Sequence, residues 1–201
     1  ESWDQDSLEA ALEAAEALRS PAIIGFGGAV VSQDWLEGRG LEELATLTRC
    51  LAERSSVPTA IMLNEVNTVD HVRRGLECGC NAVMLQTSHL PFAENVRLSQ
   101  RIVELARGFG AAVEAELGQL AEAGSAAGDI AMATTPDEAA RFVSATGVDA
   151  LAVSIGNIHL LTSGEADVDL ELLAQIHRAV SIPLVVHGGT GFPCSAVRPA
   201  I

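Results

Sequence analysis

The sequence predicts an α/β fold, a parallel TIM (β/α)8 barrel, on three observations. Short apolar segments alternate six times with longer segments of helical period, and such βα repeats form a parallel sheet with helices outside it. Polar residues follow at least four of the apolar segments. A doubly wound sheet places its ligand site at one switch point, whereas a barrel assembles it from many strand ends. The spread of polar strand ends therefore favours the barrel.

The number of predicted strands is lower than a closed barrel needs. A TIM barrel has eight strands, but this chain begins with a helical segment and ends soon after its candidate for the seventh strand. We therefore expect strands one and eight to be missing from these residues. No low-complexity linker divides the chain, so residues 1–201 are expected to form one incomplete barrel domain.

The predicted strands are short segments rich in aliphatic and β-branched residues. They are residues 21–26, 57–63, 82–85, 111–116, 148–154 and 182–186. The second strand ends in Asn64 and Glu65, the third is followed by residues 86–89, and the last ends at His187. Because parallel strands end at one edge of a sheet, these polar groups are expected at the same edge.

The predicted helices have apolar residues at helical spacing, with polar residues on the other face. They are residues 7–19, 41–54, 68–78, 91–107, 136–146 and 169–180. Asn67 or Thr68 can cap the third, and Thr135 with Glu138 forms a capping box for the fifth, which has Pro at its first position. Two segments are predicted as loops: residues 27–40, which contain glycines, and residues 118–134, which are rich in Ala and Gly and expected to be mobile.

Composition limits the partners. The chain has 27 acidic and 12 basic residues, a formal net charge of -15, which argues against nucleic acid or an anionic membrane as a partner. Any phosphate must therefore be bound by a local nest of N–H groups. Hydrophobic residues make up 48% and aromatic residues only 3%, so the core must be aliphatic.

The same composition indicates a cytoplasmic protein. The four cysteines, Cys50, Cys78, Cys80 and Cys194, have neither zinc-ribbon spacing nor the density of a secreted disulfide scaffold, so reduced thiols are expected. No apolar run is as long as a membrane span, and residues 1–20 carry acidic residues where a signal peptide would have lysine and an apolar segment.

Residues 182–193 combine a buried strand, an ionisable ligand and a glycine loop. His187 lies where the strand stops, and residues 188–191 can take positive φ and present successive N–H groups to an anion. Gly188, Gly189 and Thr190 are therefore candidates for phosphate binding beside a metal-binding or basic His187. The alternative is that His187 only caps a strand and the glycines only form a tight turn.

Three residues at different strand ends form a candidate metal-binding set. Glu65, His159 and His187 would supply one carboxylate and two neutral imidazoles, a known zinc set that leaves a coordination position for substrate. Taken singly, Glu65 could instead be a solvated loop acid and His159 a loop hydrogen-bond donor. Together they predict a divalent metal ion, with Zn²⁺ preferred.

At these residues the chain resembles the class II, metal-dependent ketose-bisphosphate aldolases, which act on fructose and tagatose bisphosphates. The resemblance covers almost the whole chain and is most specific in four segments, residues 88–95, 113–118, 154–159 and 184–191. It implies a TIM barrel in a dimer, tetramer or other assembly that binds Zn²⁺ and cleaves a phosphorylated ketose to dihydroxyacetone phosphate and an aldehyde. It also makes His159 and His187 metal ligands, residues 188–190 part of the phosphate loop, and Glu116 an acid near the metal.

The chain also departs from the family pattern. The family usually ends its third strand with Asp-His, where this chain has Asn64 and Glu65, and Asn64 cannot accept a proton as a carboxylate. Proton transfer would then pass to Glu116 or His89. Gln86 replaces a usual Asp beside Ser88 on the expected substrate side, Leu160 replaces a usual Gly, and the phosphate-binding residues of strand eight have no counterpart.

Three functions remain open from the sequence. The first is a divergent metal-dependent aldolase that cleaves or forms a small phosphorylated ketose. The second is a non-catalytic barrel that serves as a binding or assembly subunit, which the replacement at Asn64 would allow. The third is a phosphate-binding barrel without metal. We favour the first, because a retired site has no reason to keep a carboxylate at residue 65 that can bind the metal.

Overall fold

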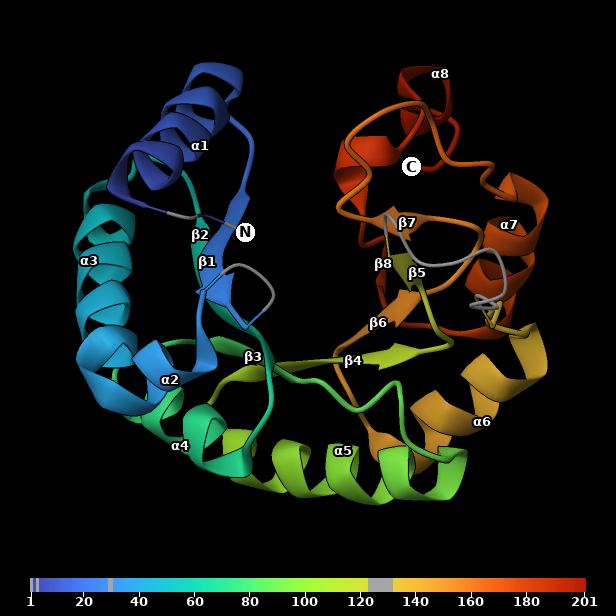
Figure 1. Cartoon of the computed structure of the whole chain (residues 1–201), viewed down its shortest axis with the longest axis horizontal. Helices are drawn as coiled ribbons and strands as arrows, with labels where there is room; N and C mark the ends of the chain where they lie inside the picture. The colour runs from blue at the N-terminus through green and yellow to red at the C-terminus, as the bar shows by residue number, and fades with distance from the viewer. Residues whose placement is uncertain (1, 3, 29–30, 123–131) are drawn as a thin grey trace. The chain divides into compact units, whose positions relative to one another are not determined.

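The computed structural model describes residues 2, 4–28, 31–122 and 132–201 (Figure 1). These residues form two compact units. The first unit contains Glu1–Gln86 and Arg101–Glu114, and the second contains Thr87–Gln100 and Ala115–Ile201.

Helices and strands alternate along the chain as the sequence predicts. The helices are α1 (Gln5–Leu18), α2 (Gln33–Trp35), η1 (Leu36–Gly40), α3 (Leu41–Arg54), α4 (Val69–Glu77), α5 (Phe92–Arg107), α6 (Pro136–Thr146), α7 (Leu170–Ala179), η2 (Gly189–Gly191) and α8 (Cys194–Val197). The strands are β1 (Ala22–Gly27), β2 (Thr59–Val66), β3 (Ala82–Leu85), β4 (Ala112–Leu117), β5 (Ala121–Glu122), β6 (Ala150–Val153), β7 (Ile158–His159) and β8 (Leu184–Val185).

In the first unit a parallel sheet is covered by amphipathic helices. β1 pairs with β2, β2 with β3, and β3 with the first half of β4, all parallel. The apolar faces of α1 and α3 pack on β1, where Leu8, Leu12, Ile24 and Leu51 form a buried cluster. Figure 1 shows these two helices along the same side of β1. The predicted aliphatic core is present here.

In the second unit β4 is followed by β6 and β8, and α6 packs against α7. Thr135 caps α6 as predicted, and its side chain contacts both the N–H and the carboxylate of Glu138. Asp169 caps α7 in the same way through the N–H of Leu172. The short strands β5 and β7 form a separate parallel pair. These local signals fix where the helices begin, and hence where the strand-end loops stop.

The strand order supports a barrel-type sheet over a doubly wound one. The six-stranded parallel sheet has the order β1-β2-β3-β4-β6-β8, so its strands follow one another as they do in the sequence. A doubly wound sheet would reverse its order at a switch point. The α/β class and the parallel sheet are confirmed, and the order is consistent with part of a TIM barrel. The absence of strands one and eight and the single-domain assignment stay predictions.

Three segments differ from the sequence prediction. The predicted loop over residues 27–40 contains α2 and η1, a π-helical turn that is interrupted at Gly38 (φ −73°, ψ −129°). The predicted loop over residues 118–134 contains β5 and an antiparallel bridge between Gln119 and Met132, and its residues 123–131 lie outside the described part of the chain. The residues expected to form a loop after β6 include the short strand β7.

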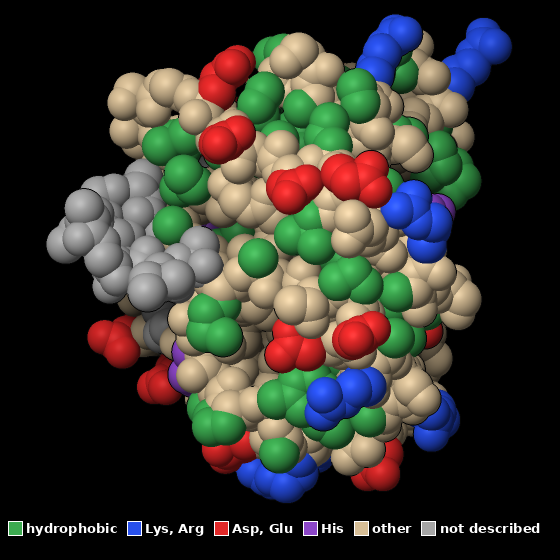
Figure 2. All heavy atoms as spheres, turned by 90° about the vertical axis from the view of Figure 1, so that its right-hand side faces the viewer, with side chains coloured by type: hydrophobic (Ala, Val, Ile, Leu, Met, Phe, Trp, Pro, Cys, Tyr) green, Lys and Arg blue, Asp and Glu red, His purple; other side chains and the backbone are tan. Residues whose placement is uncertain are grey.

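Acidic side chains are scattered among apolar ones over the face drawn in Figure 2, with arginines more toward its edges. No single acidic patch dominates this face. Among the helices that the structure describes, none combines the length and the apolar character needed to cross a lipid bilayer.

Candidate functional site

Asn64 and Glu65 lie in an irregular part of β2, in the first unit. Leu63 pairs with Val83 and Val66 with Leu85, so the register shifts by one residue between them. Glu65 has φ of 48°, in the left-handed region that residues other than glycine seldom occupy. Bulges of this kind often occur next to active sites and redirect a side chain. The sequence placed both residues after the strand, whereas β2 continues through them.

Burial makes this strand end unusual. Asn64 is 8% exposed and Glu65 is 4% exposed, and a buried carboxylate is costly unless hydrogen bonds or a cation compensate for its lost hydration. The backbone around them is well fixed, because Gly27 pairs with Asn64 and the N–H of Gly28 donates to the carbonyl of Asn64 at 3.1 Å. The interpretation of Glu65 as a solvated loop acid is therefore wrong.

The two predicted histidines meet in the second unit. His159 lies on β7, which pairs with β5 in register Glu122 to His159, and His187 lies beyond the end of β8. Their ring centroids are 5.6 Å apart and the ring planes are tilted by 44°. Each ring offers a nitrogen within 4.8 Å of one on the other ring. The strand-end argument therefore placed these two residues correctly relative to each other.

This pair fits a divalent metal ion. Two nitrogens bound tetrahedrally at about 2.0–2.1 Å from zinc lie roughly 3.3 Å apart, and the nitrogens of these two rings already lie within 4.8 Å of each other. Both imidazoles are only partly exposed, and both end strands rather than helices. Neutral imidazoles on rigid backbone are the ligands that zinc most often takes together with a carboxylate. Histidines this close would repel one another if both were protonated, so metal binding competes with protonation.

The glycine loop adjoins His187. Gly188 has φ of 72°, and a Cβ there would lie 2.2 Å from the carbonyl oxygen of Ile158, so only glycine fits. Gly189 and Thr190 are exposed and begin η2, whose first N–H groups have no partner within the helix. A Cβ on Gly189 would meet nothing within 4 Å, so space is open above that residue. These features suit the predicted anion nest.

The remaining predicted residues follow β3 or lie on β4. Gln86 and His89 are exposed and Ser88 is half-buried, in the turn that leads into α5. Glu116 is 4% exposed in the second half of β4. The carbonyl of Glu116 accepts a hydrogen bond of 2.9 Å from the side chain of Asn95. The backbone of Glu116 is therefore fixed by Asn95, which lies in the same segment, residues 88–95, as Ser88 and His89.

Buried polar residues near these groups were missed by the sequence analysis. The side chain of Asn95 connects Thr87 to Glu116, that of Thr134 connects Leu117 to Ser154, and that of Asn157 connects Ile155 to His187. All three residues are nearly inaccessible to solvent. A polar residue inside an otherwise apolar strand-end segment was the available signal, as in the Ser-Ile-Gly-Asn-Ile-His segment, where Asn157 lies two residues before His159.

Leu160 is the second strained residue at the site. It follows His159 and has φ of 54°, although the sequence analysis noted that glycine is usual there. A side chain in this conformation costs roughly 1–2 kcal/mol relative to the right-handed region. Of the three non-glycine residues with positive φ in the described chain, Glu65 is itself a predicted metal ligand and Leu160 directly follows one. Such strain is typical of functional sites.

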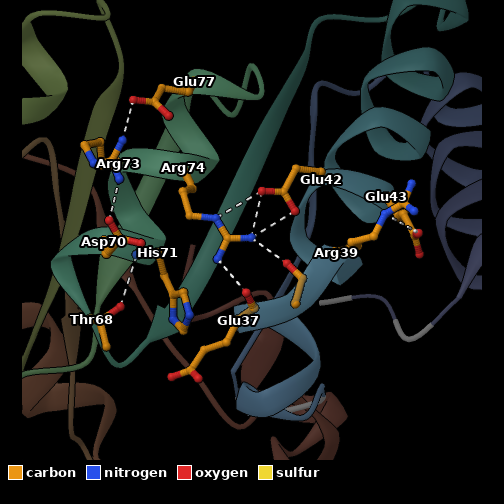
Figure 3. A network of polar contacts seen from close by, with 11 residues as sticks. Glu37, Arg39, Glu42, Glu43, Thr68, Asp70, His71, Arg73, Arg74 and Glu77 are labelled. Carbon is orange, nitrogen blue, oxygen red and sulfur yellow. Dashed lines mark hydrogen bonds and ion pairs between the residues drawn. The ribbon is translucent and has the colours of Figure 1, made fainter.

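An ion-pair cluster fixes the segment that follows β1 (Figure 3). Arg74 on α4 donates to both carboxylate oxygens of Glu42, at 2.7 and 2.9 Å, and to the carbonyls of Glu37 and Gly38. We call these four residues the Arg74 cluster. Burial alone would raise the pKa of Glu42, but the hydrogen bonds from Arg74 and the backbone, together with the charges of Arg74 and Arg39, outweigh burial and hold that pKa below its ordinary value.

The buried cysteine is not a nucleophile in this fold. Burial in apolar surroundings is the main reason that the pKa of Cys80 rises to about 12, so its thiol stays protonated near neutral pH. Burial also raises the pKa of Cys78.

Comparison with known proteins gives one family and several similar folds. The model of a family described as class II fructose-bisphosphate aldolase matches residues 3–201. The YdjI aldolase from Escherichia coli K12 has 31% sequence identity and a TM-score of 0.83, over 99% of this chain and 69% of that one. A proposed fructose-1,6-bisphosphate aldolase from Coccidioides immitis has 26% identity and a TM-score of 0.84, over 99% and 70%. A fructose-bisphosphate aldolase from Campylobacter jejuni, at 23% identity and a TM-score of 0.73 over 97% and 65%, shares the fold.

Proposed function

Because the chain belongs to the class II fructose-bisphosphate aldolase family, we propose that it catalyses metal-dependent aldol cleavage and condensation of a small phosphorylated ketose. The products of cleavage would be dihydroxyacetone phosphate, or a similar ketone, and an aldehyde. The observation that carries this proposal is the pair of imidazoles, His159 and His187, on two strand ends of a chain that the family model matches throughout.

His159 and His187 would hold the metal, with Glu65 as our proposed third ligand because it is a buried carboxylate at a strand end. A bound divalent ion, with zinc preferred, would act as a Lewis acid that draws electrons from the ketose carbonyl. A Schiff base to an enzyme lysine is the other common way to activate a ketone. All 12 basic residues other than histidine are arginines, so none of these 201 residues can form one.

The chain's own residues would bind and orient the substrate. Gly188, Gly189 and Thr190 would hold the phosphate through backbone N–H groups and a hydroxyl, and Gln86 and Ser88 would contact the sugar. Asn64 can orient the hydroxyl next to the bond that breaks, but its amide cannot take the proton. Glu116 or His89 would accept it. We further propose a cytoplasmic homo-oligomer, a dimer or tetramer, which light scattering can test.

Metal analysis is the first experiment. The purified protein should bind one equivalent of Zn²⁺ per chain, and His159→Ala and His187→Ala should each lower the affinity at least tenfold. His177→Ala is the matched control, because that histidine lies in the last turn of α7 and should leave the affinity unchanged. Equal affinity in all four proteins would contradict the proposed metal site.

Gly189→Val tests phosphate binding. No Cβ clash arises at Gly189, so the variant should fold while its side chain fills the space over the loop. We expect phosphorylated ketoses to bind at least tenfold more weakly and Zn²⁺ to bind as before. If phosphorylated and dephosphorylated ligands bind the natural protein equally, the loop is not a phosphate site.

Asn64 separates catalysis from the second candidate function, a non-catalytic binding or assembly subunit. We expect feeble cleavage of fructose 1,6-bisphosphate by the natural sequence. Asn64→Asp should restore a proton acceptor and raise the rate by about tenfold or more, since general acid–base catalysis contributes roughly 10² to 10⁴. No gain with metal and phosphate affinity intact would favour the binding subunit. Strong cleavage by the natural protein would show that another residue already takes the proton.

A further inference from the structure

The two histidine-bearing segments diverge from neighbouring parallel strands. β6 and β8 pair through Leu151 with Leu184 and Ala152 with Val185, and the pairing then stops. After β6 the chain turns through residues 154–159, which we call the histidine loop, and after β8 it turns at Gly188. The carbonyls of Val153 and His187 lie just beyond this last strand pair, where the two segments separate.

The side-chain amide of Asn157 serves both carbonyls. Its Nδ2 donates to the carbonyl of His187 at 3.0 Å and to that of Val153 at 3.3 Å. Its Oδ1 accepts from the N–H of Ile155 at 2.8 Å. A primary amide has two donors and an acceptor, so all its capacity except one lone pair is used. Asn157 is fully buried, so its amide joins the two segments without exposing these backbone groups to water.

Backbone packing joins the same two segments one residue further on. The Cα of Gly188 lies so close to Ile158 that a Cβ would be 2.2 Å from its carbonyl oxygen. Asn157 and Ile158 therefore contact His187 and Gly188, residue against residue. His159 is the next residue after Ile158, and its strand is fixed on its other side by β5. The separation of the two imidazoles thus depends on a junction that includes the side-chain hydrogen bond from Asn157 to the carbonyl of His187.

We propose that Asn157 is a positioning residue for metal binding, which holds His159 and His187 at the separation that one divalent ion requires. This inference rests on the proposed function, in which those histidines are metal ligands. A neutral amide suits this place because it fixes the backbone without adding a charge beside a cation. A buried charged group would cost several kcal/mol in desolvation and would change the field at the metal.

Asn157→Asp is the decisive variant. Aspartate has the same size and keeps an acceptor for the N–H of Ile155, but it cannot donate to the carbonyls of His187 and Val153. A role limited to the turn inside the histidine loop predicts near-normal metal affinity, whereas the proposed role predicts a loss. The matched control is Thr146→Val, which removes a buried hydrogen bond to Phe142 within α6, in the same unit but outside the two segments that carry the histidines.

The measurement is Zn²⁺ affinity by competition with a chromophoric chelator, together with the visible spectrum of Co²⁺ as a probe of ligand geometry. We expect Asn157→Asp and Asn157→Ala to bind Zn²⁺ 10- to 100-fold more weakly, the range typical of groups that orient metal ligands. Their Co²⁺ spectra should also change. Thr146→Val should bind within twofold of the natural protein, with an unchanged spectrum.

Each outcome has a separate meaning. Normal Zn²⁺ affinity in folded Asn157→Asp would overturn the positioning role, while the losses in His159→Ala and His187→Ala would still support the metal site. Normal affinity in those two histidine variants would instead overturn the proposed function. If the Asn157 variants unfold, the measurement is repeated in sucrose, which favours the compact state. Normal affinity in the refolded variants would then overturn the positioning role.

Discussion

Two irregular segments of the chain, one in each unit, are stabilised by different kinds of hydrogen bond, charged in one and neutral in the other. η1 after β1 is fixed by the Arg74 cluster, in which a guanidinium with 17% of its side chain exposed faces a carboxylate with 45% exposed. The histidine loop after β6 is fixed by Asn157, a neutral amide with no exposed surface. Both follow strand ends, where backbone groups leave the ladder and need other partners.

The difference reflects what each segment adjoins. A partly exposed charged pair keeps some of its hydration, but salt and low pH weaken it. A buried amide carries no charge, so its hydrogen bonds do not depend on salt or on pH. The segment that carries a proposed metal ligand is thus fixed by groups that do not change between pH 5 and 8. Four predictions test this contrast, from the largest expected effect to the smallest.

Asn95→Ala should cause the largest loss. The side chain donates to the carbonyl of Glu116 at 2.9 Å and accepts from Thr87 at 2.8 Å and from Ser99 at 3.1 Å. Removing it deprives three buried groups of a partner, and each such loss costs about 1–3 kcal/mol. We expect the free energy of unfolding in urea to fall by about 2–4 kcal/mol. Ser99→Ala is the control and should cost about 1 kcal/mol or less; equal losses in both would contradict the central role of Asn95.

Arg74→Met should cause a smaller loss. Methionine keeps most of the apolar stem, so the change isolates the charged hydrogen bonds to Glu42 and the two carbonyls, which we expect to contribute about 1–2 kcal/mol. Arg73, the next residue on α4, pairs with Asp70 and Glu77 on the exposed surface and provides a matched control (Figure 3). Arg73→Met should destabilise less than Arg74→Met. The reverse order would show that burial of the guanidinium is not what matters.

The contribution of Glu42 should depend on pH and salt. A carboxyl with a lowered folded-state pKa stabilises the fold at pH values above its unfolded pKa, and this stability is lost as the pH falls through the folded pKa. The pKa of Glu42 is lowered from 4.5, because hydrogen bonds from Arg74 and the backbone and the nearby arginine charges together outweigh the effect of burial. The stability gap between natural protein and Glu42→Gln, measured in urea, should therefore be constant above about pH 6 and close below pH 4.5. The stability difference between natural protein and Glu42→Gln should also decrease in 1 M NaCl, whereas the difference between natural protein and Asn95→Ala should stay the same.

The sequence predicted the elements that local patterns specify and missed those that distant contacts create. Thr68 and Thr135 cap their helices as predicted, because a cap needs only residues three positions away. η1 was missed since its backbone is fixed by Arg74, which lies 36 residues beyond Gly38. β5 and β7 exist only as a pair, so neither half has a signal of its own.

In the candidate site, too, the sequence predicted residues with a local signal and missed those whose contacts lie far along the chain. His159 and His187 were found because each ends or follows an apolar strand segment, a property visible in the sequence. Asn157 was passed over because its role depends on the carbonyl of His187, 30 residues away. The strain at Glu65 was equally invisible, since it arises where two strands shift register. Residue type and strand position predict ligands, whereas the groups that orient them emerge only from the fold.

Leu160→Gly should have the smallest effect and the opposite sign. Leu160 is 52% exposed, so removing its side chain gives up little burial, while glycine occupies φ of 54° without strain. The relief of roughly 1–2 kcal/mol exceeds the entropy that glycine adds to the unfolded chain, roughly 0.5–1 kcal/mol, so a net gain of about 0.5–1 kcal/mol is expected. Arg19→Gly, at the C-cap of α1 with φ of 52°, should give a similar gain in the other unit. Leu160→Ala keeps the strain and should show no gain.

The same variants test whether this strain matters for metal binding. If Leu160→Gly gains stability but binds Zn²⁺ more weakly, while Arg19→Gly gains stability with metal affinity unchanged, the strain beside His159 contributes to holding that ligand. Unchanged affinity in both variants would leave the positioning of the histidines to Asn157 and the Gly188 contact alone.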